Sequence, residues 1–263
     1  MVEALDPKLV VIQVGQDPAS TSYIKQKIKS CDAVGMCYEH RHLPEDTTLE
    51  HLFTIVHALN EDTGTSGFIL QLPLPAHLQP HVPRILREID PMKDVDGFTA
   101  YNLGKMFLGT EFEHLPPATP GGVIRLLEHY NIDVQGKDAV VVGHSNTVGK
   151  PLATMLLNRN ATVSSCHIHT KDLAHYTRNA DLLFVAVGKP GLITAGMVKE
   201  GAVVVDIGIS RTDEGLKGDV DFDAVQKKVS AITPVPGGVG PMTVASLIRN
   251  CVTAKERQMA LRE

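Results

Sequence analysis

Tyr23 and Lys27 are separated by four residues in a segment whose apolar residues Ile24, Ile28 and Cys31 recur at helical spacing. On a helix, residues four apart share a face. A lysine whose pKa is lowered by burial or by a neighbour serves as an acid or base, and an aromatic ring one turn away forms a wall for a flat substrate. A solvated lysine beside a half-buried tyrosine is the simpler interpretation of the pair alone.

Three further polar residues occupy positions where chemistry is possible. Gln71 ends a predicted buried strand, where an amide needs a partner, either within the core or in an active site. Asp94 and Asp96 lie in a loop before Gly97. Such carboxylates bind the edge of an amidine-like heterocycle through charge-assisted hydrogen bonds, or they serve as turn residues. Two acids alone do not indicate a metal site, and we expect none.

The segment TPVPGGVGPMT, residues 233–243, alternates proline and glycine. Proline stiffens the backbone and glycine allows close approach to another molecule, although an ordinary turn is the simpler interpretation of such a cluster. A helix is predicted over residues 244–252 with Thr243 as its cap. A glycine loop that leads into a helix suits an anion or a flat polar ligand.

A predicted strand over residues 138–142 leads into GHSNTVG, residues 143–149, and then into a helix. This is where a doubly wound fold holds a pyrophosphate, although Ser145 replaces the usual second glycine and a plain turn is the alternative. Residues 164–171 carry no acid for the ribose hydroxyls. Histidine and lysine there favour NADP, with NAD as the alternative. His167 and His169 resemble a metal pair, but no third ligand is evident.

Strands and helices alternate along the chain, which predicts parallel sheets. Strands are expected at residues 9–14, 67–72, 138–142, 162–166, 182–187, 202–207 and 230–232. Helices are expected from Ser20 or Ser22 to Gly35 and at residues 51–60, 81–88, 123–130, 150–158, 172–178 and 194–199. We therefore predict two α/β lobes flanking a cleft that holds the substrate, the second a Rossmann-like doubly wound parallel sheet. The first lobe spans residues 1–117 and is joined by the C-terminal helix 243–263, and the dinucleotide-binding lobe spans residues 118–242.

Composition narrows the functional classes. An apolar content of 43% excludes a disordered chain, and a net charge of −5 gives no basic field for nucleic acid. No apolar run is long enough for a bilayer, so no membrane partner is expected. The four cysteines are scattered and no signal peptide is evident, which predicts a cytoplasmic protein.

Taken together, these stretches resemble the methylenetetrahydrofolate dehydrogenase/methenyltetrahydrofolate cyclohydrolase family. The matching motifs are VGQDPAS (14–20) with Tyr23 and Lys27, QLPL (71–74), KDVDG (93–97), Gly143 and Ser145 with Val148 and Gly149, and PVPGGVGPMT (234–243). The resemblance implies a homodimer that uses NADP to oxidise 5,10-methylenetetrahydrofolate and then hydrolyses the methenyl product to 10-formyltetrahydrofolate.

The resemblance also implies residue roles. Lys27 is the acid and base of the hydrolysis, Gln71 orients it, and Tyr23 stacks on the aminobenzoyl ring of the folate. Asp94 or Asp96 binds the pterin. The other positions implied for the substrate are Leu72, Pro236, Gly237, Gly238, Val239 and Gly240, and those implied for the cofactor are Thr119, Gly143, His144, Ser145, Ile168, Ile209 and Thr243.

Two positions depart from the pattern of the family. NADP-type members often carry arginine where this chain has His144, and arginine or serine where it has Ile168. Three alternatives therefore stay open: a catalytically silent folate-binding homologue, an NAD-dependent monofunctional dehydrogenase, and an unrelated two-lobed oxidoreductase that acts on a small hydroxy acid.

Overall fold

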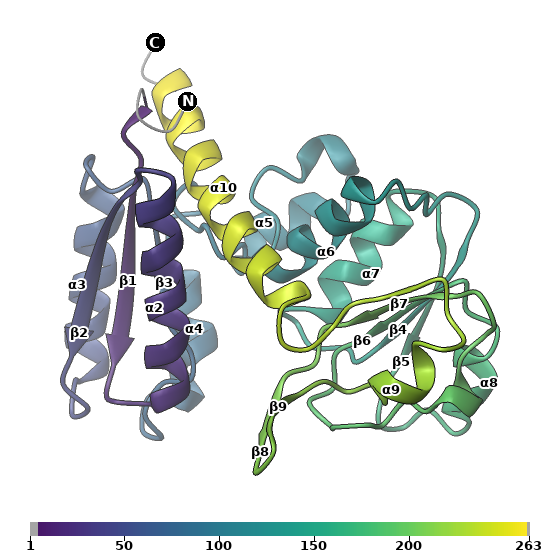
Figure 1. Cartoon of the computed structure of the whole chain (residues 1–263). Coiled ribbons are helices and arrows are strands. Elements are labelled where there is room, and N and C mark those ends of the chain that lie inside the picture. Colours follow the sequence, from purple (N-terminus) through teal and green to yellow (C-terminus); the bar gives the residue numbers. More distant parts are fainter. Residues whose placement is uncertain (1–4, 262–263) are drawn as a thin grey trace. The chain divides into compact units, whose positions relative to one another are not determined.

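The computed structural model describes residues 5–261 and separates into two compact units (Figure 1). The first unit comprises Met1–Lys105, Glu113–Ala118 and Val244–Glu263, and the second comprises Met106–Phe112 and Thr119–Thr243. Residues 1–4 and 262–263, at the ends of the predicted first lobe, lie outside the described residues.

The first unit contains a parallel sheet with the order β2-β1-β3, formed by β1 (Lys8–Val14), β2 (Cys37–Leu43) and β3 (Gly67–Leu70). Side chains of a strand alternate between the two faces of its sheet. Leu9 and Val11 of β1 accordingly pack in one core with residues of α2 (Pro18–Ala33) and α10 (Val239–Ala260). Val10 and Ile12 pack in the other core with α3 (Leu49–Glu61) and α4 (Val82–Arg87). Burial on both faces explains the unbroken apolar run of β1.

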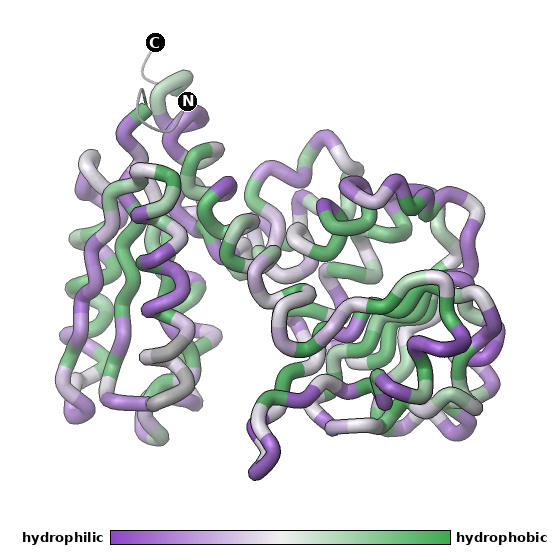
Figure 2. Tube along the Cα trace, in the orientation of Figure 1, coloured by the Kyte–Doolittle hydropathy of each residue, from purple (hydrophilic) through white to green (hydrophobic). Residues whose placement is uncertain are grey.

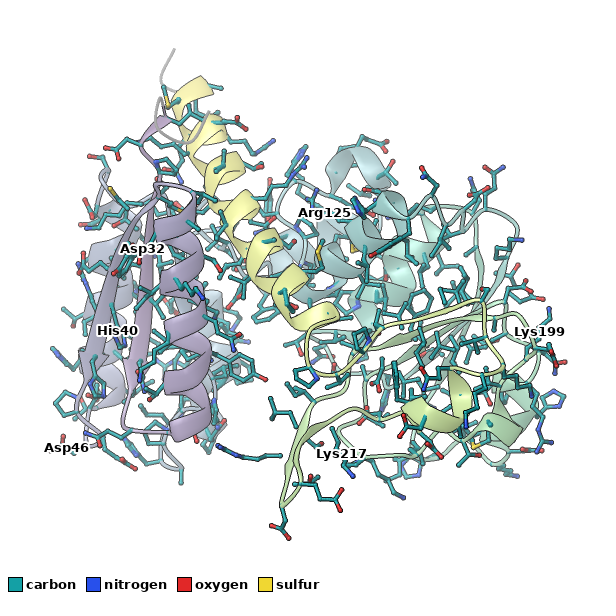
Figure 3. The ribbon with its side chains drawn as sticks, in the orientation of Figure 1. Asp32, His40, Asp46, Arg125, Lys199 and Lys217 are labelled. Carbon is teal, nitrogen blue, oxygen red and sulfur yellow. The ribbon has the colours of Figure 1, made fainter. Side chains whose placement is uncertain are left out.

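Several predicted elements of the first unit are confirmed, namely the strands at residues 9–14 and 67–72 and the helices at residues 51–60 and 81–88. The predicted start of the first helix is late, because the Asp17 carboxylate accepts the N–H of Ser20 (2.7 Å) and caps α2 earlier. β2 was not predicted. It is an edge strand with mostly polar side chains, and its His40 (Figure 3) shares a hydrogen bond with the Gln13 side chain (3.0 Å).

The second unit contains a five-stranded parallel sheet with the order β10-β7-β6-β4-β5. Its strands are β4 (Asp138–Val142), β5 (Thr162–Cys166), β6 (Leu182–Val185), β7 (Val203–Asp206) and β10 (Ala231–Ile232). The chain runs outward from β4 to β5 and then returns to β6 on the other side of β4, so the strand order reverses there. This confirms the predicted doubly wound sheet. The strands of this sheet are mostly apolar (Figure 2).

Helices cover both faces of the second sheet, with α6 (Ala118–His129) and α7 (Gly149–Leu157) on one face and α8 (Leu173–Thr177) and α9 (Phe222–Val225) on the other (Figure 1). The predicted helix at residues 194–199 is only a 3₁₀ turn, η3 (Ala195–Met197). Sequence reasoning missed α9 and the hairpin of β8 (Ser210–Thr212) and β9 (Gly215–Lys217), on which Lys217 lies (Figure 3). It also missed α5 (Ala100–Met106) and the turns η1 (Gln79–His81) and η2 (Thr110–Phe112).

The last helix, α10, begins at Val239, inside the proline–glycine segment. The prediction that Thr243 caps this helix is therefore wrong. Thr243 lies within the first turns, where its hydroxyl donates to the carbonyl of Val239 (3.3 Å). The first turn of a helix accepts Pro241, because the N–H that proline lacks has no intrahelical partner there.

Within residues 5–261, no helix is long and apolar enough to cross a membrane. All four cysteines carry free thiols, of which only Cys37 is exposed.

Candidate active site

Lys27 and Gln71 meet in the first unit. Lys27 lies on α2, and Gln71 directly follows β3, where its backbone N–H donates to the carbonyl of Ile12 (2.8 Å) and extends the sheet. The Lys27 amine donates to Gln71 Oε1 (2.9 Å), and Gln71 Nε2 donates to the carbonyl of Leu72 (2.8 Å). Because the carbonyl of Leu72 binds the amide nitrogen, the amide oxygen is turned toward the lysine.

The Lys27 amine lies in a protein environment that disfavours its charge. Burial lowers the pKa of Lys27, and the charge of the Asp96 carboxylate acts in the opposite direction. A lysine with a lowered pKa exchanges its proton near neutral pH more readily than a solvated one. Tyr23, one turn earlier on α2, is half-buried, and burial raises the pKa of its phenol. Tyr23 is therefore a neutral ring at neutral pH.

Asp94 and Asp96 differ in what they contact. Asp94 is buried, and its carboxylate accepts the N–H groups of Gly97 (2.9 Å), Phe98 (3.1 Å) and Thr99 (2.7 Å). Its Oδ2 also accepts from the side-chain amide of Asn102 (3.0 Å), on α5. Asp94 thus stabilises the turn that starts α5. Of the two alternatives that the sequence allowed for this acid, ligand binding or a turn residue, the contacts of Asp94 match the turn residue.

Asp96 is half-buried and interacts electrostatically with Lys27. Burial raises the pKa of the Asp96 carboxyl to about 6, Lys27 lowers it, and Asp94 raises it further. A carboxyl with such a pKa binds or releases a proton close to neutral pH. Of the two acids, Asp96 is therefore the one with an electrostatic link to Lys27.

The second unit contains the predicted dinucleotide loop between β4 and α7. Gly143 has φ +111°, and a Cβ there would lie 2.2 Å from the carbonyl oxygen of Ala186. A Cβ on Gly149 would lie 1.9 Å from the carbonyl oxygen of Gly143. Both positions therefore require glycine, which matches the tight turn and close helix–strand packing of a dinucleotide-binding loop.

Ser145 orders this loop. Its Oγ accepts the N–H groups of Val148 (3.1 Å) and Gly149 (3.4 Å) at the start of α7. The serine hydroxyl thus binds two of the amides that were expected to meet an anion. His144 and Ile168 are exposed at the ends of β4 and β5, and Ile168 is 90% exposed.

The remaining predicted cofactor residues lie at the start of α6, at the start of α10 and after β7. Thr119 and Thr243 are in contact, since their hydroxyls share a hydrogen bond (3.1 Å between the two Oγ1 atoms). Ile209 is 42% exposed in the segment before β8. In the proline–glycine loop, Pro236 and Gly237 are exposed and Gly237 has φ +102°, while Val239 is buried and already belongs to α10.

Two family models together match most of the chain. The catalytic domain of tetrahydrofolate dehydrogenase/cyclohydrolase matches residues 2–96, and the NAD(P)-binding domain of the same enzymes matches residues 117–259. The chain belongs to the tetrahydrofolate dehydrogenase/cyclohydrolase family. This confirms the resemblance found in the sequence.

Relatives with a similar sequence or structure cover nearly the whole chain. The bifunctional protein FolD of Wolinella succinogenes is 54% identical over 96% of this chain and 87% of its own. The bifunctional enzyme FolD of Campylobacter jejuni superposes with a TM-score of 0.93, at 49% identity over 97% of this chain and 90% of that one. The Trypanosoma brucei enzyme, solved with NADP and an inhibitor, has a TM-score of 0.91 at 35% identity over 96% of this chain and 88% of that one.

Sequence reasoning missed a buried pair of acids in the NAD(P)-binding domain. Asp206, at the end of β7, accepts the N–H groups of Gly208 (3.1 Å), Asp219 (3.0 Å) and Val220 (2.9 Å). Asp219 accepts those of Val187 (2.6 Å) and Gly188 (2.9 Å) after β6. The pair therefore fixes the loops at the carboxyl ends of β6 and β7. An acid that ends the apolar run VVVD was the available signal.

Burial raises the pKa of Asp206 to about 6, the N–H groups that it accepts lower it, and the charge of Asp219 raises it. Asp219 Oδ1 is buried without a hydrogen-bond partner in the part of the chain that the structure describes. Burial and the neighbouring charge of Asp219 therefore favour the protonated form of the Asp206 carboxyl.

Proposed function

We propose that the chain oxidises 5,10-methylenetetrahydrofolate to 5,10-methenyltetrahydrofolate with NADP and hydrolyses the methenyl product to 10-formyltetrahydrofolate. Membership of the family and the bifunctional relatives support both activities. The observation that carries the hydrolysis is the hydrogen bond between Lys27 and Gln71, with the Asp96 carboxylate interacting with the same amine. A catalytically silent homologue would have no use for a half-buried lysine held in this way.

The proton transfers of the hydrolysis fall to Lys27. Water adds to the methenyl carbon, and the neutral amine of Lys27 accepts the proton that the bound water loses. The resulting ammonium donates a proton to the ring nitrogen as its bond to the one-carbon unit breaks. The hydroxyl of that unit loses its proton to the amine, which leaves the formyl group on the other nitrogen and releases one proton overall. Gln71 holds the amine in place in both forms, because its amide oxygen accepts a hydrogen bond from either.

The folate is recognised by residues around this amine. Tyr23 stacks on the aminobenzoyl ring, since it is neutral and lies one turn from Lys27. Asp96 binds the pterin, because Asp94 already accepts three backbone N–H groups and one side-chain amide. Leu72 and the loop of residues 236–240 line the substrate, as the resemblance to the family implies.

NADP binds at the loop between β4 and α7, where Gly143 and Gly149 allow the turn and the start of the helix to pack closely against the protein backbone. When bound, it accepts the hydride that leaves the methylene carbon. Gly143, His144, Ser145 and Ile168 line its phosphates and ribose. Thr119, Ile209 and Thr243 line the rest of it.

The test follows both reactions in one sample. With 5,10-methylenetetrahydrofolate, the protein should reduce NADP, as measured by the absorbance of the reduced nicotinamide. With 5,10-methenyltetrahydrofolate alone, it should remove the methenyl chromophore faster than buffer does. A folded protein that does neither would contradict the proposal, and one that only reduces the nicotinamide would be a monofunctional dehydrogenase.

We further propose a homodimer that acts in the cytoplasm. The resemblance to the family supports the dimer, and four free cysteines are compatible with a reducing compartment. Sedimentation equilibrium at micromolar concentration should give twice the mass of one chain. A monomer at that concentration would contradict the dimer.

A further inference from the structure

The carboxylates of Asp94 and Asp96 are held in different ways, although a single residue separates them. The Asp94 carboxylate accepts hydrogen bonds from three backbone N–H groups and one side-chain amide. The Asp96 carboxylate accepts none from the residues that the structure describes, and it interacts with Lys27 through its charge. The direction of the Asp96 side chain is therefore set by the backbone on either side of it.

The residue before Asp96 is anchored to α10. The side chain of Val95 is buried in one core with residues of α2 and α10. The start of β3 lies against it, since a Cβ on Gly67 would come within 2.1 Å of Val95 Cγ1. The carbonyl of Val95 accepts a hydrogen bond from Asn250 Nδ2 of α10 (2.9 Å). Val95 is thus held by both its side chain and its backbone.

The residue after Asp96 lies against a second segment of the same unit. A Cβ on Gly97 would lie 2.5 Å from the carbonyl carbon of Pro116. The Ala118 N–H donates to the carbonyl of Asp96 (3.3 Å). The carbonyl of Pro116 accepts a hydrogen bond from the same Asn250 Nδ2 (2.8 Å). One amide group therefore joins the two backbone segments that adjoin Asp96.

Asn250 is a polar residue at an apolar position of α10. Its side chain is 1% exposed, and its neighbours Leu247 and Cys251 belong to the hydrophobic core. A buried amide destabilises a fold unless its hydrogen bonds are formed. An amide nitrogen has two N–H donors, which matches the two carbonyls of Val95 and Pro116. Because carbonyl oxygens only accept, the nitrogen of the amide has to face them.

A second amide of α10 shows what a purely structural tie looks like. Gln258 is half-buried, and its Nε2 donates to the carbonyls of Ser66 (2.6 Å) and Met92 (3.0 Å). Neither of these carbonyls adjoins a residue to which we assign a role in folate binding. Asn250 differs because its two hydrogen bonds end at the segments that adjoin Asp96.

We infer that Asn250 is a positioning residue for folate binding, because its amide holds the backbone on both sides of Asp96 and so directs the Asp96 carboxylate. The inference rests on the proposed function, in which Asp96 binds the pterin. A charge-assisted hydrogen bond weakens when its distance or direction changes. Without the amide, two buried carbonyls lose their donor and the two segments are no longer joined. The carboxylate then loses its alignment with the pterin and with Lys27.

The experiment is a double-mutant cycle of Asn250→Leu and Asp96→Asn in the full chain. Leucine is close to asparagine in size and removes both N–H donors, and Asp96→Asn removes the charge with little change in shape. Calorimetry measures the affinity for 5-formyltetrahydrofolate, which has the pterin and aminobenzoyl groups of the substrate and no methenyl bridge. Asn250→Leu should weaken binding about tenfold in the parent and less than about twofold in the Asp96→Asn chain, since coupled residues are not additive.

Steady-state hydrolysis of 5,10-methenyltetrahydrofolate gives a second readout. Asn250→Leu should raise KM about tenfold and change kcat less than about threefold, because Lys27 and Gln71 keep their own hydrogen bond. Asn250→Ser keeps one hydroxyl donor and should recover part of the affinity. A residue that only supports the fold would not change KM selectively.

Asn60→Leu is the matched control. The Asn60 side chain also joins two backbone segments of the catalytic domain, with hydrogen bonds to the carbonyl of Glu88 (2.6 Å) and the N–H of Asp90 (2.9 Å). Both Asn60→Leu and Asn250→Leu should lower the midpoint of urea unfolding. Only Asn250→Leu should change KM, and its effect on the urea midpoint should be the same with and without Asp96→Asn.

The outcomes separate this inference from the proposed function. An equal loss of affinity from Asn250→Leu in both backgrounds, or no loss in the parent, would overturn the inference and leave the proposed function intact. If Asn250→Leu does not fold, Asn250→Ser goes through the same cycle with the same criteria. If Asp96→Asn binds the folate as tightly as the parent, the role of Asp96 is wrong and the inference fails with it. A folded parent that neither binds 5-formyltetrahydrofolate nor hydrolyses the methenyl substrate would contradict the proposed function itself.

Discussion

The catalytic domain and the NAD(P)-binding domain hold their functional residues in different ways. Around Lys27, the polar groups bind one another: Gln71 binds Lys27 and the carbonyl of Leu72, and Asp94 binds the turn that carries Asp96. Around the dinucleotide loop, glycines and backbone define the shape, while His144 and Ile168 extend from it as exposed side chains.

This difference separates chemistry from selectivity. The Lys27 amine, to which we assign the proton transfers, depends on several partners at once, so a change at any of them alters its position or its pKa. The side chains of His144 and Ile168 are exposed, so their exchange should cost little stability, and exchange at such positions is one way in which a fold accommodates different ligands.

Lys27→Met should cause the largest effect. The variant keeps the apolar stem and removes the amine, so hydrolysis of 5,10-methenyltetrahydrofolate should fall about 100- to 10,000-fold, the usual contribution of a positioned acid and base. NADPH affinity, measured by calorimetry, should stay within about twofold because the cofactor lies in the other domain. Lys25→Met changes an exposed lysine of α2 and is the matched control. Equal hydrolysis by parent and Lys27→Met would remove Lys27 from its role.

Asp94→Ala and Asp96→Ala should separate stability from activity within the catalytic domain. Asp94→Ala leaves three N–H groups without their acceptor and should lower the free energy of unfolding by about 3 kcal/mol or more. Asp96→Ala should instead mainly lower folate affinity and change the pH profile of hydrolysis. Urea unfolding and steady-state kinetics on both variants provide the measurements. If Asp96→Ala unfolds as readily as Asp94→Ala and retains full activity, the assigned roles are reversed.

Gly149→Ala tests the NAD(P)-binding domain in the same way. The added Cβ would meet the carbonyl of Gly143, so the loop has to shift, at a cost of about 2–3 kcal/mol of stability. NADPH affinity should fall with it, while hydrolysis should persist in the chain that remains folded. Gly196→Ala is the control, because nothing lies near its Cβ position. Unchanged NADPH binding by Gly149→Ala would remove the dinucleotide from this loop.

Buried and periodic elements were predictable from the sequence, because their apolar pattern is also what packs them. The strands β1, β4, β6 and β7 and the amphipathic α3 are examples. β2 was not predictable from the sequence. It is an edge strand whose sequence, CYEHRHL, has mostly polar side chains and no apolar run. The short α9 and the hairpin of β8 and β9 have too few residues for a periodic signal.

For the candidate site, the sequence identified residues but not their partners. The spacing of Tyr23 and Lys27 placed them on one face of a helix, but only the fold brings Gln71, 44 positions away, to the Lys27 amine. Asp94 and Asp96 have different roles because only the Asp94 carboxylate faces the turn. The pattern DVDG does not reveal which of its two acids does so. Asp206 and Asp219 lie on either side of the hairpin of β8 and β9 in the sequence, and no local motif predicts that the two meet.

The smallest expected effect concerns this second pair of acids and the pH dependence of stability. The pKa of Asp206 is about 6 in the folded chain, above its ordinary 3.8, so folding favours the protonated form. Its contribution to stability is fully present below the ordinary pKa and is lost as the pH rises through about 6. The side chain of Asp206→Asn cannot ionise. Relative to the parent, the free energy of unfolding of this variant should therefore rise by about 2 kcal/mol from about pH 4 to pH 8. A constant difference across that range would show that Asp206 is ionised throughout and that its three N–H donors outweigh its burial.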